Sequence, residues 1–75
     1  MKKSAFMEEL MDILDVETLS ESQKLQDLKG FDSLAAMSIA ALIRSAVNVN
    51  ISGKAVKDAG TVGDLMDMIG REKFE

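Results

Sequence analysis

The residues in this chain best placed to do chemistry are a polar pair, Asp32 and Ser33, directly before a long apolar segment. A side-chain oxygen of such a pair can accept hydrogen bonds from the free N–H groups of a first helical turn, so the pair predicts a helix start. The helix dipole concentrates partial positive charge at this position, where a phosphate group binds well. The local pattern alone favours a cap without chemistry, because most such pairs only begin helices.

The composition argues against several function classes. The 75 residues include no Cys and no His, so neither a Ser-His nor a Cys-His nucleophile can form. The acidic residues are scattered, so we expect no metal site, and we predict that the chain is not an enzyme. A net charge of −4 without a visible basic face argues against nucleic acid as a partner.

The length and hydropathy of the chain predict its number of domains and its location in the cell. Seventy-five residues are enough for one small core, so we expect a single domain over residues 1–75 and a monomer. No apolar run approaches the length of a membrane span, and no signal-peptide pattern opens the sequence. We therefore expect a cytoplasmic protein that does not insert into a membrane.

Apolar spacing predicts a first helix from Ser4 to Leu14, with Ser4 as its N-cap. Its apolar stripe consists of Phe6, Leu10, Ile13 and Leu14. The polar stretch 15–29 has no such period, but Leu25 and Leu28 stand three residues apart and predict one helical turn within a long crossover. Gly30 then marks a tight turn before the next helix.

The segment from Leu34 to Val47 is apolar around most of a helical circumference. It either lies at the centre of a bundle or presents one weakly polar face to a partner, and the pattern leaves both alternatives open. Asn48 is typical of a helix end. A short helix is expected within Ser52 to Ala59.

The last helix is predicted to begin at the N-cap Thr61, with Asp64 completing a capping box, and to end at Gly70. The predicted fold class is therefore all-α: a small bundle of three main helices plus one short helix, with a long first loop. The side chains that we expect in the core are Leu10, Ile13, Leu34, Leu42, Val47, Ile51 and Leu65.

Taken together, these motifs resemble the acyl carrier proteins and the related peptidyl and aminoacyl carriers. The likeness covers nearly the whole chain and rests on Asp32-Ser33-Leu34 at the second helix and on Thr61-Val62-Gly63-Asp64-Leu65 at the last one. Further matches are Leu25, Asp27-Leu28 and Ile51. The stretch from Gly30 to Leu34 is similar to the Gly-Trp-Asp-Ser-Leu version of some discrete carriers, with Phe31 in place of Trp.

The resemblance implies that Ser33 carries 4'-phosphopantetheine, attached by a separate phosphopantetheinyl transferase, and that Asp32 helps to position this reaction. The thiol of the group would hold an acyl, aminoacyl or peptidyl intermediate as a thioester, loaded by a ligase and used by downstream transferases. Side chains expected to meet partner enzymes are Leu34, Ala35, Met37, Ser38 and Ala41.

One departure from the family pattern concerns the second helix, which usually carries several acidic residues. The segment from Leu34 to Val47 contains no acid and one Arg, so electrostatic steering by this helix should be weak. We therefore expect a discrete carrier for a dedicated lipid, surface-polysaccharide, aminoacyl or secondary-metabolite pathway. The alternative is an unmodified helical interaction module with the carrier fold.

Overall fold

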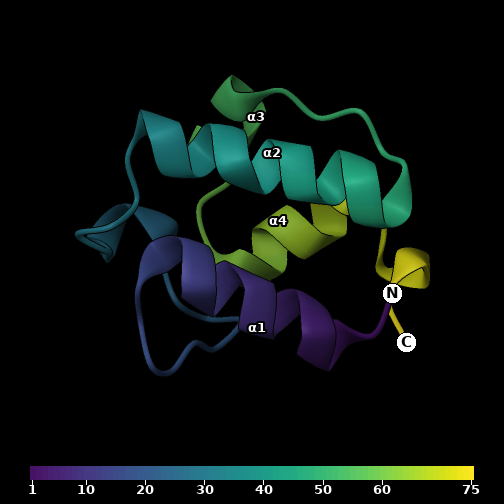
Figure 1. The fold of residues 1–75 in the computed structure, drawn as a ribbon, viewed down its shortest axis with the longest axis horizontal. Coiled ribbons are helices and arrows are strands. Elements are labelled where there is room, and N and C mark those ends of the chain that lie inside the picture. Colours follow the sequence, from purple (N-terminus) through teal and green to yellow (C-terminus); the bar gives the residue numbers. More distant parts are fainter.

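The chain forms four α-helices and two short 3₁₀ turns, without β-strands. The computed structural model describes residues 1–75. Its elements, in chain order, are α1 (Lys3–Leu14), η1 (Leu25–Asp27), α2 (Ser33–Val47), α3 (Gly53–Lys57), α4 (Val62–Ile69) and η2 (Arg71–Lys73). Figure 1 shows α1 and α2 running across the molecule, α3 beside α2, and α4 between α1 and α2 in this view. The predicted all-α bundle of three main helices and one short helix is confirmed.

One apolar cluster joins the four helices and η1, and no polar side chain is buried in it. Its members are Phe6, Leu10, Leu14, Leu25, Ala35, Ala36, Ile39, Ile43, Val56, Val62, Leu65, Met66 and Ile69. Burial of this apolar surface is the main favourable term in folding such a small bundle. None of the helices combines the length and the apolar run that a membrane crossing requires.

The core predictions are confirmed in part. Leu10 and Leu65 are fully buried, whereas Ile13, Leu42, Val47 and Ile51 are half-buried and pack against the edge of the cluster. The prediction for Leu34 is wrong, because its side chain is 73% exposed. Since α2 is apolar nearly all round, spacing could not show which stripe faces inward. The buried stripe runs through Ala35, Ala36, Ile39 and Ile43.

The start of α1 differs from the prediction, because the helix begins at Lys3 and Ser4 lies inside it. The N-cap is Lys2, which makes no side-chain capping bond. The opposite end of the chain holds this start instead: the Lys3 N–H donates to the Glu75 carbonyl at 3.2 Å, and the Glu75 N–H donates to the Met1 carbonyl at 3.0 Å. A long-range contact thus replaces the local cap.

The first loop lies against the start of α4, as the crossover prediction requires. The Leu25 N–H donates to the Gly60 carbonyl at 2.8 Å, and the Val62 N–H donates to the Gln23 carbonyl at 3.0 Å. The predicted helical turn is the 3₁₀ turn η1, in which Leu25 is fully buried. The loop is therefore an ordered part of the bundle.

Gly30 is required for a close approach between two segments. A Cβ at this position would lie 2.4 Å from the Leu14 carbonyl oxygen, a backbone atom that cannot rotate away. A glycine is therefore needed before α2 because the chain passes close to the end of α1 there. Any side chain at residue 30 would push the turn away from Leu14.

Candidate functional site

Asp32 caps α2, and Ser33 is the first residue of the helix. Asp32 has an extended backbone, and its Oδ1 accepts a hydrogen bond from the Ala35 N–H at 2.8 Å. Because Asp32 supplies the cap, the exposed hydroxyl of Ser33 is not needed to stabilise the helix. The two polar residues therefore have separate roles: one begins the helix and the other presents a hydroxyl to solvent.

Two backbone N–H groups at this helix start have no acceptor within the protein. The N–H groups of Ala35 and Ala36 donate to the side chain and the carbonyl of Asp32, respectively. None of the protein's hydrogen bonds uses the N–H of Ser33 or of Leu34. These donors point out of the positive end of the helix dipole, where they favour an anion.

A lysine from α3 lies beside the Ser33 hydroxyl. This residue is Lys57, and its Nζ is 3.4 Å from Ser33 Oγ. The Gln26 side-chain amide of η1 donates a hydrogen bond to the Lys57 carbonyl, which attaches the end of α3 to the first loop. Sequence reasoning missed Lys57, because no local pattern links residues that lie 24 positions apart.

The outward face of α2 begins next to Ser33. Leu34 and Met37 are 73% and 63% exposed, and Ser38 and Ala41 are exposed as well. Ala35 does not belong to this face: it is only 7% exposed and packs in the core, so it cannot serve in partner recognition as predicted. The remaining four residues form one patch, which we call the outer α2 face.

All charged side chains from Ser33 to Lys57 are basic. They are Arg44, Lys54 and Lys57, and none of them forms an ion pair. The whole chain has a net charge of −4, so its acidic residues lie on the other segments. The segment from Ser33 to Lys57 is therefore apolar with basic groups in an otherwise acidic protein, and Asp32 and Asp58 lie directly at its two ends.

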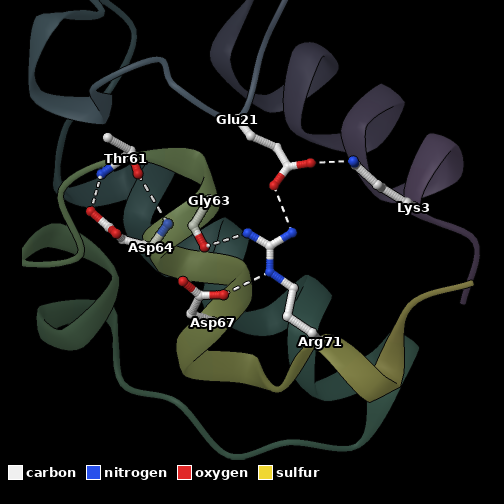
Figure 2. A network of polar contacts seen from close by, with 7 residues as sticks. All are labelled: Lys3, Glu21, Thr61, Gly63, Asp64, Asp67 and Arg71. Atoms are coloured by element: carbon white, nitrogen blue, oxygen red, sulfur yellow. Dashed lines mark hydrogen bonds and ion pairs between the residues drawn. The ribbon is translucent and has the colours of Figure 1, made fainter.

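A second group of polar residues lies along α4, between the first loop and Arg71 (Figure 2). Arg71 contacts Glu21 and Asp67 at 2.6 Å each and donates to the Gly63 carbonyl at 3.3 Å, while Lys3 pairs with Glu21. Hydrogen bonds from Lys3 and then Arg71 lower the pKa of Glu21 below its usual range. These ion pairs connect the first loop to α1 and to the segment after α4, which is a structural role.

A comparison with protein families agrees with the geometry at the start of α2. The family model described as "phosphopantetheine attachment site" matches residues 4–69, which include Ser33 and nearly all of the four helices. Neither the curated proteins nor the solved structures yield a match.

Proteins of this family hold 4'-phosphopantetheine covalently on a serine and are generally not catalytic themselves. A carrier of this kind interacts with a phosphopantetheinyl transferase and with the enzymes that use the carried group. Because the matched range covers well over half of the chain, the chain belongs to the phosphopantetheine attachment site family, the carrier proteins of the acyl carrier type.

Proposed function

We propose that Ser33 is the attachment serine and that the protein carries an acyl, aminoacyl or peptidyl intermediate in the cytoplasm. The observation that supports this most is the exposed Ser33 hydroxyl at the first residue of α2, beside the unpaired N–H groups of Ser33 and Leu34. A phosphodiester on this oxygen would lie at the positive end of the helix dipole. The phosphopantetheine thiol supplies the thioester chemistry that a chain without Cys lacks.

The one group of this chain that reacts in the attachment step is an accessible hydroxyl. Ser33 Oγ would form a bond to the β-phosphorus of coenzyme A, and the pyrophosphate P–O bond would break. Adenosine 3',5'-bisphosphate leaves, and the hydroxyl proton passes to the transferase or to water. Asp32 serves this step as a positioning residue, because its cap on the Ala35 N–H sets where the helix, and hence Ser33, begins.

The test is the intact mass after incubation with coenzyme A and a broad-specificity phosphopantetheinyl transferase. We expect the wild-type protein to gain one phosphopantetheine group and Ser33→Ala to gain none. Ser38→Ala is the matched control, since Ser38 is another exposed serine of α2 and should not affect the gain. A gain that persists in Ser33→Ala would place the attachment on another serine.

The second candidate function is an unmodified interaction module with the same fold. It is favoured by the exposed Leu34 and Met37, which form an apolar contact surface without any modification. If several transferases add no mass to the folded wild-type protein, either a dedicated transferase is required or the protein is this unmodified module. A partner would then be sought by binding to the outer α2 face.

We further propose that the carrier serves a dedicated pathway, whose enzymes recognise the outer α2 face through apolar contacts. The absence of acidic residues from Ser33 to Lys57 supports this, because a basic docking surface on a partner would find no complementary charge. The double substitution Ser38→Glu, Ala41→Glu should therefore impair loading by the cognate ligase. Faster loading of this variant would contradict the proposal, and Glu9→Gln on α1 provides a charge change away from this face.

A further inference from the structure

Lys57 is a cation without a counter-charge, placed beside the hydroxyl proposed for modification. Its Nζ lies 3.4 Å from Ser33 Oγ, and it forms no ion pair with any carboxylate. Lys54, on the same short helix, is also exposed but has no contact with Ser33. The contact between the Lys57 ammonium and a neutral hydroxyl is weak in water. The same contact would be stronger if the Ser33 oxygen carried a negatively charged group.

The backbone of Lys57 is fixed although its side chain is exposed. Ser52 caps α3 by accepting from the Ala55 N–H at 3.1 Å, and Val56 is fully buried in the core. The Gln26 amide donates to the Lys57 carbonyl. Because these contacts hold the end of α3, little beyond the lysine side chain must be ordered for its ammonium group to stay near Ser33.

We propose that Lys57 binds the phosphodiester of the modified protein and so holds the base of the phosphopantetheine arm against the start of α2. This inference rests on Ser33 being the attachment site. Modification turns Ser33 Oγ into an ester oxygen next to an ionised phosphate oxygen. The Lys57 ammonium and the unpaired N–H groups of Ser33 and Leu34 then supply the donors on the protein side.

The proposal makes Lys57 a positioning residue for the arm. A phosphate with one ion pair and helix N–H donors has fewer orientations than one hydrated by solvent alone, so the first bonds of the arm would leave the protein in a restricted direction. The arm would then start along the outer α2 face, where Leu34 and Met37 are exposed. Loss of the lysine would free the base of the arm without removing the arm.

The experiment compares the melting temperatures of unmodified and modified protein for the wild type, Lys57→Gln, Lys54→Gln and Lys57→Arg. We expect modification to raise the melting temperature of the wild type by roughly 1–8 °C more than that of Lys57→Gln, the range for one exposed ion pair in a domain of this size. Comparing the four melting temperatures as a cycle cancels the separate effects of the modification and of the Lys57→Gln substitution. Lys54→Gln should behave like the wild type, and Lys57→Arg should retain most of the difference.

The possible outcomes distinguish a wrong role for Lys57 from a wrong carrier function. If the mass gain occurs and modification raises the melting temperature of wild type and Lys57→Gln equally, the role of Lys57 is wrong while the carrier function stands. If no variant gains mass, the proposed function fails first. A difference that remains in about 1 M NaCl would also contradict an exposed ion pair, because the Debye length is then only about 3 Å.

A second measurement covers the case in which Lys57→Gln is not modified. The side-chain ¹⁵Nζ resonance of Lys57 is recorded in the wild-type protein before and after modification, with Lys54 as the internal control. We expect the Lys57 resonance to shift and to exchange its protons more slowly, while Lys54 stays unchanged. Equal behaviour of the two lysines would overturn the proposal.

Discussion

The starts of α2 and α4 use similar capping chemistry but end up with different surroundings. At α4, the first four N–H groups all have protein acceptors, which are the Gln23, Glu21 and Thr61 carbonyls and the Thr61 hydroxyl. At α2, Asp32 satisfies the N–H groups of Ala35 and Ala36, and the two before them stay open. One helix start is closed by the protein, and the other is open to a ligand.

The difference comes from what packs against each helix start. Residues 21–25 of the first loop cover the beginning of α4, and a Cβ on Gly63 would lie 3.2 Å from the Glu21 carbonyl oxygen. At the start of α2, the Lys57 cation of α3 contacts the Ser33 hydroxyl, and no loop covers the first N–H groups. A capping motif therefore becomes a candidate anion site only where its neighbours leave N–H groups free and add positive charge.

The largest expected effect separates the first leucines of the two helices. Leu65→Ala should lower the free energy of unfolding by about 2–5 kcal/mol, because this side chain is fully buried and its loss leaves a cavity. Leu34→Ala should change it by less than about 0.5 kcal/mol, as expected for an exposed side chain. Urea denaturation measures both values. Equal losses would mean that the start of α2 is also packed against the core.

A smaller effect is expected for the hydroxyl residues at the two starts. Thr61→Ala removes a capping box and should cost about 1 kcal/mol, whereas Ser33→Ala leaves the Asp32 cap intact and should cost a few tenths. Asp32→Ala is the matched control, because it removes the cap of α2 and should cost about as much as Thr61→Ala. A large loss in Ser33→Ala would show that this serine is structural.

The smallest effect concerns the ion pairs that fasten the first loop near α4 (Figure 2). Because Lys3 and Arg71 lower the pKa of Glu21 in the folded state, its stabilising contribution is complete above the ordinary pKa of an unfolded Glu, about 4.3. That contribution is lost as the pH falls through the lowered folded pKa. Urea midpoints of the wild type and Glu21→Gln should therefore differ by a small, constant amount from neutral pH to about pH 5.

Below that range the difference between the two midpoints should shrink. It should also be smaller at high salt, because the groups involved are exposed and the solvent screens them. A difference that stays constant well below pH 4 would contradict a paired Glu21 carboxylate.

Sequence patterns predicted most of the helix ends in this chain. The cap within the Asp32-Ser33 pair, the cap at Thr61 and the ends at Asn48 and Gly70 follow from residues within a few positions of one another, and each is present in the structure, with Asp32 as the capping member of the pair. The Ser4 cap was wrong, since Glu75 and Met1 hold that end through contacts across the whole chain. Local rules cannot foresee such a contact.

The orientation of α2 was also beyond the reach of local patterns. Its composition is so uniformly apolar that several stripes could face the core with similar burial. The predictions put Leu34 both in the core and at the partner surface, and Ala35 at the partner surface only. In the structure Leu34 is exposed and Ala35 is buried. Small side chains at Ala35 and Ala36 let α2 approach the core closely, so packing between helices selected the stripe.

Short-range sequence signals were thus enough to establish four helices, their order and the position of Ser33 at a helix start, because caps and apolar periods act within one or two turns. Three features depended on contacts between distant segments: the closed start of α4, the side of α2 that faces solvent, and the approach of Lys57 to Ser33. These contacts form only when the helices pack, and no periodicity in the chain encodes which side chains then meet.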